Sequence, residues 1–372
     1  MPWLYNAFRR FVGKHFFMTE TEKSKYNLRR DLIYQELYDL VVNSLPGTRL
    51  PSENALAAKF KVARMTVAWA FKKLERENLI ERRKGSGSFV KGVRTVTYFL
   101  PAMDCLTRQD GNGAIHRQIM QGLMRGAENL QLRFETMVPC LENSRFKYTP
   151  RLMTSLNSGS LVVLTYWFGE MFHILAEKRI RTAMICNQEN CRGLKQYMTD
   201  WFVCEGKRRF AVRKVLQLLQ EKSCRKIAIT NLYPEDRHHP ITETYLEYIQ
   251  EKSGMPVIIN LPKLLLAPCQ SRSILQSHLQ AAYEKEKFDA LLINTGQMFL
   301  GKNINEYCGL PESVRIFGVN IQKEQVLLEN PFPYCYAPYE KMGEDAVELL
   351  ALSARQGVCR QYDYIFENIN LL

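Results

Sequence analysis

The sequence predicts two folded parts: a small, mainly helical domain that ends in a β-hairpin, and a larger α/β domain with parallel sheets in two subdomains. Three observations lead to this prediction. A chain of 372 residues is too long for one ordinary hydrophobic core. Residues 28–92 contain three helix-length segments followed by a glycine-rich turn. From residue 93 onward, short apolar runs typical of strands alternate with helix-length amphipathic segments.

The first expected helix covers residues 28–44 and ends before Pro46 and Gly47, which cannot continue it. Its apolar residues recur at spacings near three and four, as on one face of a helix. These residues are Leu28, Leu32, Leu37, Leu40 and Val41.

A second and a third helix follow closely. Ser52 is placed to cap the second helix with its hydroxyl, and this helix ends near Val62. The third starts near Ala63 and ends near Asn78. Two short β-prone runs then flank residues 84–87, Lys-Gly-Ser-Gly, which is a hairpin signal. A hairpin after a third helix is a wing, so the segment predicts a winged helix-turn-helix.

The remaining chain predicts a repeated strand and helix order, which favours parallel sheets covered by helices. Its length favours two doubly wound subdomains over one. The expected strands are 95–100, 161–166, 181–186, 226–230, 257–260, 289–294 and 315–319. The expected helices are 115–131, 169–178, 206–222, 241–253, 272–287, 297–301 and 340–355.

The formal net charge of +13 is concentrated near the start of the chain. Residues 1–92 carry 18 Lys and Arg against 9 Asp and Glu, whereas the other 280 residues carry 33 against 29. Neutralisation of phosphate charges by Lys and Arg contributes to the affinity of proteins for any nucleic acid. We therefore expect this segment to bind a polyanion. A solvated basic surface is the alternative interpretation.

Other sequence features favour a cytoplasmic protein without enzymatic activity, metal or cofactor. The ten cysteines form no CxxC pair and are expected to be reduced and mostly buried. No apolar run approaches the roughly 18 residues that span a bilayer. The motifs HExxH, GxSxG and GxxxxGK[ST] are absent, and His238 with His239 is expected to lie in a solvated loop rather than bind metal.

Residues 50–90 resemble the winged helix of the GntR family over their whole length. The shared elements are the LPSE start, the R-x-TV start of the third helix, the L-E-x-x-x-L-I exit and the GxGxFV wing. The resemblance implies binding to double-stranded DNA, with the third helix in the major groove and the wing at the minor groove. The expected DNA-binding residues are Ser52, Asn54, Arg64, Thr66, Lys72, Arg83, Lys84, Gly85, Ser86 and Gly87.

Two departures from that family affect the expected DNA target. Asn54 and Ala68 stand where the family usually has arginine, so fewer guanine-reading groups remain. Trp69 follows Ala68 and is open to two interpretations, contact with a DNA or protein surface and packing in the core. Ser52 is equally open, because it could contact a phosphate or act only as a helix cap.

Residues 94–372 are similar to the effector-binding domain of LacI/GalR regulators, which resembles periplasmic sugar-binding proteins. YFLP, IMQGLMRGAENLQL, RKIAIT, DALLINTG, RIFGVN and the closing YEKMGEDAVELL carry this similarity. It implies a homodimer and a small-molecule effector, with a sugar as the usual class, bound between the two subdomains. The expected effector-binding residues are Tyr98, Trp167, Asp200, Asn294, Thr295 and Asn320.

The cleft also departs from its family. An arginine expected within residues 240–242 is absent, and Thr295 and Asn320 replace two carboxylates. A ligand-independent DNA-binding or interaction protein with a degenerate cleft is therefore the alternative function. An aminotransferase-like second domain is disfavoured by its length.

The expected domains are an N-terminal extension at 1–24 that need not be ordered, a DNA-binding domain at 25–92 and an effector-binding and dimerisation domain at 93–372. The extension has two further interpretations, a helix on a membrane surface and sequence upstream of a true start at Met18. The chain as a whole is expected to be a transcriptional regulator, and a repressor is the favoured kind.

Overall fold

The computed structural model describes residues 20–372, apart from 43, 45–46, 78, 92–93, 142–143, 157–159, 188–192, 233–238, 263–270 and 354–356. The chain divides into two compact units, Met1–Gly92 and Val93–Leu372. Residues 1–19 of the expected extension lie outside the described residues. Helix α2 begins at Glu20, so the last residues of the range 1–24 are helical.

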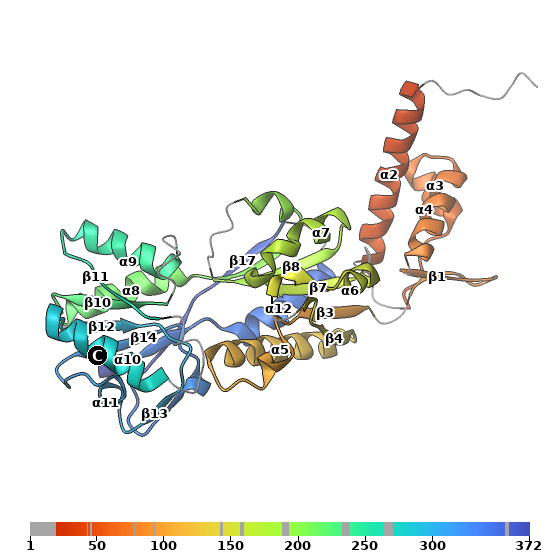
Figure 1. The fold of residues 1–372 in the computed structure, drawn as a ribbon. Helices are drawn as coiled ribbons and strands as arrows, with labels where there is room; N and C mark the ends of the chain where they lie inside the picture. The colour runs from red at the N-terminus through yellow and green to blue at the C-terminus, as the bar shows by residue number, and fades with distance from the viewer. Residues whose placement is uncertain are drawn as a thin grey trace, which may run out of the picture. The chain divides into compact units, whose positions relative to one another are not determined.

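The first unit is a winged helix-turn-helix. It comprises α2 (Glu20–Val42), α3 (Glu53–Phe60), α4 (Arg64–Arg76), β1 (Ile80–Arg83) and β2 (Gly87–Val90) (Figure 1). Leu37 and Val41 of α2 share one hydrophobic core with Leu56 of α3 and with Val67 and Phe71 of α4.

The expected apolar face of the first helix was wrong at two positions. Leu32 and Leu40 are 59% and 38% exposed. The buried stripe instead runs along the face that includes Ile33, Tyr34 and Tyr38, because aromatic rings there supply the contact with α4.

Trp69 of α4 packs against α2. Its ring is partly buried against the core, lies edge-on to Tyr34 at 6.3 Å between centroids, and is covered by the Arg30 guanidinium at 3.8 Å. Core packing is therefore the interpretation that the structure supports for this residue.

The expected parallel sheets of the second unit are confirmed, and the described residues form two main sheets of six strands each. The first sheet is parallel throughout, in the order β17-β9-β8-β7-β3-β4. Its strands are β3 (Thr95–Phe99), β4 (Arg133–Met137), β7 (Leu161–Thr165), β8 (Arg181–Cys186), β9 (Phe202–Gly206) and β17 (Cys359–Tyr362).

The second sheet has the order β11-β10-β12-β14-β16-β18, and only its edge strand β18 is antiparallel. Its strands are β10 (Ile227–Asn231), β11 (Val257–Asn260), β12 (Ala290–Ile293), β14 (Arg315–Val319), β16 (Tyr334–Tyr336) and β18 (Ile365–Glu367). Two small ribbons are β5 (Cys140–Leu141) with β6 (Ser144–Tyr148) and β13 (Phe299–Gly301) with β15 (Val326–Leu328). The expected helix at 297–301 is therefore wrong, because residues 299–301 pair as a strand with β15.

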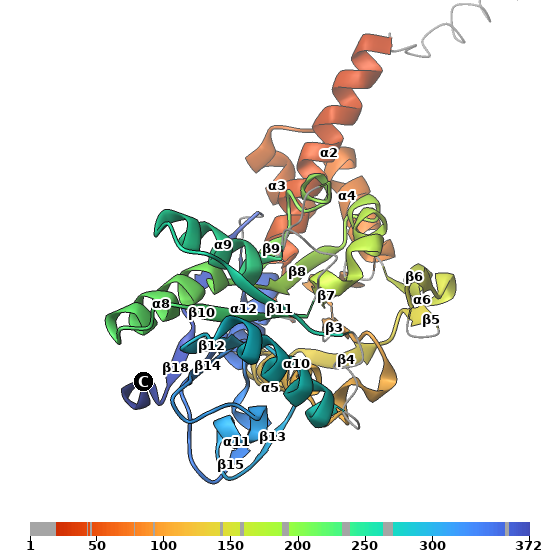
Figure 2. The same cartoon turned by 60° about the vertical axis from the view of Figure 1, so that its left-hand side comes forward.

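Helices cover both faces of the sheets, as parallel sheets require. In the second sheet, Ile227 and Ile229 belong to the core formed with α8 (Arg208–Glu221) and α9 (Pro240–Glu251), whereas Ala228 and Leu291 belong to the core formed with α10 (Ser271–Glu286). Figure 2 shows these helices beside the strands of the sheet. The helices are α5 (Gly111–Asn129), α6 (Pro150–Ser155), α7 (Phe172–Glu177), α8 (Arg208–Glu221), α9 (Pro240–Glu251), α10 (Ser271–Glu286), α11 (Ile304–Cys308) and α12 (Tyr339–Leu352).

The chain crosses between the two sheets three times: after β9, after β16 and between β17 and β18. The first and third crossings lie side by side, since the Lys207 amide donates to the Tyr362 carbonyl at 2.8 Å. This arrangement makes two subdomains joined by short segments, the geometry of a hinge.

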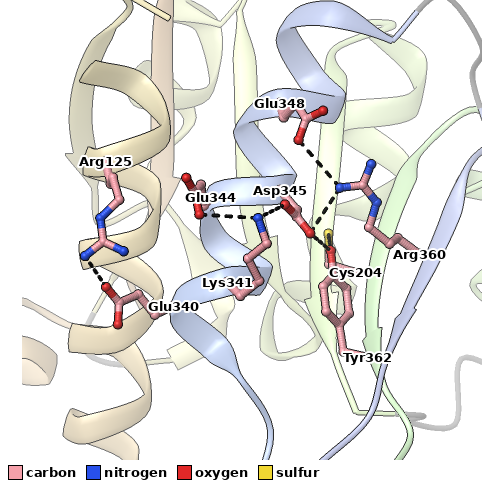
Figure 3. A network of polar contacts seen from close by, with 9 residues as sticks. All are labelled: Arg125, Cys204, Glu340, Lys341, Glu344, Asp345, Glu348, Arg360 and Tyr362. Carbon is pink, nitrogen blue, oxygen red and sulfur yellow. Dashed lines mark hydrogen bonds and ion pairs between the residues drawn. The ribbon is translucent and has the colours of Figure 1, made fainter. Parts of the chain in front are cut away.

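A buried polar cluster fixes the third crossing to the first sheet (Figure 3). The Asp345 side chain of α12 is 4% exposed and accepts from Lys341 at 2.8 Å, Arg360 at 3.0 Å and Tyr362 at 2.8 Å. Burial raises the pKa of Asp345, but the hydrogen bonds from these three partners outweigh it, and its pKa lies below the usual range. Strand β17 is thereby held to α12 just before the chain leaves for β18.

Candidate nucleic-acid interface and ligand cleft

The start of α3 is ordered by its own cap. The Ser52 hydroxyl accepts from the Ala55 amide at 3.2 Å, so the capping interpretation of Ser52 is met by the geometry. Ser52 and Asn54 are both exposed. The remaining backbone N–H groups of this first turn add a positive helix end to the surface.

Glu53 organises the arginines around this helix start. Its carboxylate, 12% exposed, accepts from Arg64 of α4 at 3.1 Å and from Arg82 of β1 at 2.5 Å. One carboxylate therefore ties together the two helices and the wing. The Arg64 side chain stays 67% exposed and is held at the first position of α4.

Arg49 completes this surface from the segment before α3. Residues 47–50 pair with β2, through hydrogen bonds that include Val90 to Thr48 and Leu50 to Ser88, both 2.8 Å. The Arg49 side chain crosses Gly87, where an added Cβ would lie 3.2 Å from Nε. A hollow of about 430 Å³ results, lined by Arg49, Leu50, Pro51, Ser52, Glu53, Asn54, Arg64, Arg82, Gly87 and Ser88.

Sequence reasoning missed Arg49, Glu53 and Arg82 in this hollow. A signal for the first two was present, because Arg49 and Glu53 flank the LPS run that carried the resemblance. The ion pairing of Glu53 with both arginines could not be read from the sequence, because Arg82 lies 29 residues from Glu53 and approaches it only in the folded chain.

The wing turn has the conformation that its glycines allow. Gly85 and Gly87 have φ of 77° and 109°, values that other residues rarely adopt. Lys84 and Ser86 are exposed at the tip, and Arg83 is exposed beside its ion-pair partner Glu81. Lys72 is exposed on α4.

The expectation that Thr66 faces DNA is contradicted. Its side chain is 5% exposed, because the third residue of α4 falls on the same buried side as Val67 and Ala70. Met65, one residue earlier, is 75% exposed and takes the outward position instead.

A cleft of about 490 Å³ lies between the two subdomains of the second unit. It opens at the carboxyl ends of strands from both sheets, where parallel α/β folds place their ligands. Residues at or just after the carboxyl ends of the strands line it. They are Pro101 after β3, 165–167 at the end of β7, 185–187 at the end of β8, Arg208 after β9, Leu232 after β10, 294–296 after β12, Asn320 after β14 and Tyr339 after β16. The start of α5 contributes Gly111, Asn112, Ile115 and His116.

Four of the expected effector residues are in this cleft, and two are not. Trp167, Asn294, Thr295 and Asn320 line it. Tyr98 is fully buried in β3 and bonds His116 Nδ1 at 2.7 Å, because β3 is an interior strand covered on both faces. Asp200 is exposed and precedes β9, so it lies at the opposite end of the strand from the cleft.

Polar groups at the cleft form a continuous hydrogen-bonded chain, named here the polar chain, of Arg208, Tyr364, Asn320, Tyr339 and Asn187. Arg208 Nε donates to the Tyr364 hydroxyl at 3.3 Å, and Tyr364 donates to Asn320 Oδ1 at 3.4 Å. Asn187 Nδ2 donates to the Tyr339 hydroxyl, which donates to the same Asn320 oxygen at 3.3 Å. The polar chain joins groups from both subdomains.

Sequence reasoning missed most of these cleft residues. Arg208 and Tyr339 are the first residues of their helices, and Asn187 directly follows a strand, so their placement after a strand was a usable signal. The other missed polar residues include Arg108, Asn112, His116, His239 and Gln325. His239 is not in a solvated loop, since it lines the cleft; His238 lies outside the described residues.

Contacts across the cleft join α5 to the second sheet's loops. Arg117 donates to Glu324 Oε2 from Nε at 2.9 Å and from Nη2 at 2.6 Å. The Gly111 amide donates to the Gly296 carbonyl at 2.8 Å. The Gln325 side chain occupies the space beside Gly111 that any larger residue would need. These contacts hold the two subdomains together at one edge of the cleft.

Two cleft histidines are neutral near pH 7. Burial, and secondly the charge of Arg108, lower the pKa of His116 to about 4, although Asp110 acts in the opposite direction. Burial and then Arg208 lower the pKa of His239 to about 3. Neither imidazole adds positive charge to the cleft at that pH.

The depressed pKa of His116 predicts acid sensitivity. In the unfolded chain this histidine takes up its proton near pH 6.5, whereas in the folded protein its pKa is about 4. The contribution of His116 to the free energy of unfolding is therefore fully present above pH 6.5 and is lost as the pH falls toward 4. We expect this to contribute at most about 1.4 kcal/mol per pH unit in that window. His116→Gln, which can still bond Tyr98, should lose less stability between pH 6.5 and 4.5 in urea unfolding. Parallel pH profiles for both proteins would contradict the assignment.

Metal-binding clusters, disulfide bonds and membrane-spanning helices are not found among the described residues. No group of three or more His, Cys, Asp or Glu there is placed to hold a metal ion. The cysteines in these parts are free thiols, buried except for Cys359. Within the same residues, no helix has the length and apolar character needed to cross a bilayer.

A family model matches most of the described part of the first unit. Residues 30–90 match the model for bacterial regulatory proteins of the gntR family. The chain is 27% identical over 128 residues to the uncharacterized HTH-type transcriptional regulator YurK of Bacillus subtilis (strain 168), covering 31% of this chain and 52% of that protein. It is 34% identical over 68 residues to the mannosyl-D-glycerate transport/metabolism system repressor MngR of Escherichia coli (strain K12), covering 17% and 28%. The chain thus spans about half of the first relative and about a quarter of the second.

Solved structures resemble the second unit in fold. The CelR–cellobiose complex has a TM-score of 0.53 at 14% identity, covering 85% of this chain and 98% of CelR. A LacI family regulator from Arthrobacter sp. FB24 in complex with lactose has a TM-score of 0.52 at 12% identity, covering 74% and 98%. GanP, a glucose-galactose binding protein from Geobacillus stearothermophilus, has a TM-score of 0.52 at 12% identity, covering 76% and 99%. Residues 30–90 are therefore a winged helix of the gntR family of bacterial regulatory proteins, joined to a domain with the fold of LacI-family regulators and periplasmic binding proteins.

Proposed function

We propose that this chain is a cytoplasmic transcriptional regulator, most simply a repressor, that binds a double-stranded DNA operator as a homodimer. The observation that carries the proposal is the arginine surface around Glu53. Arg49, Arg64 and Arg82 converge on a hollow at the start of α3, and a single carboxylate lies among them. Such a surface suits phosphate oxygens, which accept from arginine and from helix N-termini.

In the proposed complex, the start of α4 enters the major groove. Arg64 reaches a guanine edge or a phosphate, and Met65 offers an apolar contact to a thymine methyl. The wing tip, with Lys84, lies against the minor groove. Lys72 is exposed for a flanking phosphate.

The cleft of the second unit is the proposed effector site. A volume of about 490 Å³ is within the range that small-molecule sites occupy, which favours a ligand over the degenerate-cleft alternative. The related structures hold cellobiose and lactose, which supports a sugar as the class. Effector binding would change the closure of the two subdomains, and DNA affinity would change by the same coupling free energy.

The proposal is tested with the full chain and DNA from upstream of its own gene. We expect a retarded complex that forms on this DNA but not on unrelated DNA of equal length, and an affinity that falls steeply with salt. Light scattering should give a dimer. Equal affinity for both DNA fragments, or no affinity for either, would contradict sequence-specific regulation.

A further inference from the structure

We propose that the effector is an anion, a sugar that bears a carboxylate or a phosphate. This inference rests on the proposed function, since it takes the cleft as the effector site. It concerns the polarity of the groups that the protein presents there. Neutral sugar hydroxyls are commonly bound by carboxylate acceptors, whereas the described lining of this cleft includes two arginines and no Asp or Glu.

The hydrogen bonds of the polar chain fix the orientation of Asn320. Arg208 can only donate, so the Tyr364 hydroxyl accepts from it and directs its own proton to Asn320. The Tyr339 hydroxyl contacts the same Asn320 atom at 3.3 Å. The proton that Tyr364 directs to Asn320 needs an acceptor, so the Asn320 atom that Tyr364 contacts is the amide oxygen.

Asn320 therefore presents its amide N–H groups to the cleft. Its oxygen is occupied by Tyr339 and Tyr364, and no described residue hydrogen-bonds its nitrogen. The backbone holds it in place, because Asn320 has a φ of 59° immediately after β14. A ligand atom that meets Asn320 is thus expected to be an acceptor.

The charged side chains of the cleft point to the same ligand chemistry. Among the lining residues that the structure describes, the charged groups are Arg108 and Arg208, and none is Asp or Glu. Arg108 is 33% exposed and pairs with Asp110 at 2.7 Å, so its charge is partly compensated. Arg208 is 7% exposed at the other side, beside the polar chain. A carboxylate or phosphate at Arg208 and Asn320 would receive charge-assisted hydrogen bonds.

The rest of the cleft suits a sugar ring. Trp167 is partly buried and lines the cleft, offering an aromatic surface. The first residues of α5, α8, α9 and α12 also line it, and helix N-termini favour negative charge. His116 and His239 are neutral near pH 7, so Arg108 and Arg208 are the described charges there.

The test compares acids with their neutral parents on the full chain. Thermal shift and calorimetry are run with galactose against galacturonate, glucose against glucuronate and glucose 6-phosphate, and with inorganic phosphate alone. We expect at least one acid to raise Tm and to bind roughly 10- to 100-fold more tightly than its parent sugar. The uronates and the phosphate ester distinguish the two sources of charge.

Two variants assign the effect to the proposed groups. Arg208→Gln should remove the preference for the acid, and Asn320→Asp should do so by placing a carboxylate where a donor stood. Arg213→Gln is the matched control, because it removes the same charge from α8 where Arg213 pairs with Glu251 outside the cleft. Asn320→Asp is nearly isosteric, so it keeps the test informative if Arg208→Gln fails to fold.

The outcomes separate this inference from the proposed function. If a neutral parent sugar binds more tightly than its acid, or if both cleft variants still prefer the acid, the inference of an anionic effector is wrong. The cleft would then remain the proposed effector site. An equal response to inorganic phosphate alone overturns an acidic sugar as the ligand. If neither the acids nor the neutral sugars bind, the inference of an anionic effector is also wrong. The DNA-binding experiment above then tests the proposed function independently.

Discussion

Replacing Gly122 with alanine is expected to lower the free energy of unfolding of the second unit by roughly 3 kcal/mol or more. Gly122 lies on α5 where this helix crosses α12. An added Cβ would stand 1.9 Å from the Glu340 carbonyl oxygen and 2.9 Å from the Glu344 amide. Both are backbone atoms, so the overlap can be relieved only by moving one helix away from the other.

The neighbouring residues show that the close approach extends along the crossing. Gly343 of α12 faces α5, where its Cβ would stand 2.5 Å from the Ile119 oxygen, and Gly126 continues the contact. The Arg125–Glu340 ion pair fastens the same two helices at the surface (Figure 3). Separating them would also loosen Met342 and Val347, which are fully buried.

Chemical unfolding followed by tryptophan fluorescence would measure the effect. Gly296→Ala is the matched control, because an added Cβ there meets nothing within 4 Å and Gly296 does not have a positive φ. We expect the control to unfold within about 0.5 kcal/mol of the parent. A similar small change for Gly122→Ala would show that the two helices can part at little cost.

The fold was predictable because its signals are local. Proline and glycine ended the first helix, the glycines at 85 and 87 marked the wing, and apolar runs marked interior strands such as β7 and β12. Strands β4 and β17 were missed because polar residues interrupt them, and β9, β16 and β18 were missed because they are only three to five residues long. The short β13 was mistaken for a helix because three residues have too little periodicity to separate the two.

The candidate sites were predictable only in part because they are assembled from distant segments. Asn294 and Asn320 were assigned to the cleft from the resemblance to LacI/GalR regulators, and each directly follows an apolar strand, where such folds bind ligands. Tyr98 was placed wrongly because it lies inside its strand, and Asp200 because it lies before one. Thr66 shows the same limit on a helix, where one residue separates an exposed position from a buried one.

Replacing Arg64 with alanine is expected to weaken binding to the specific operator by roughly 10- to 100-fold. Arg64 is the first residue of α4, and Glu53 restrains its exposed guanidinium at 3.1 Å. This restraint orders the side chain before DNA arrives, so less conformational entropy is lost on binding. The loss should appear in fluorescence anisotropy with specific and scrambled DNA over a series of salt concentrations.

Arg64→Lys decides what Arg64 contacts, because lysine keeps the charge but lacks the two-pronged geometry that matches guanine. If Arg64 reads a base, lysine restores affinity for scrambled DNA but not the preference for the operator. If it contacts only phosphate, lysine restores both, and alanine lowers the salt slope by about one. Arg76→Ala is the control, because Arg76 is exposed in the last turn of the same helix. This substitution removes the same charge as Arg64→Ala. Equal losses for Arg64→Ala and Arg76→Ala would mean that the start of α4 does not enter the groove, because general charge would then explain the affinity.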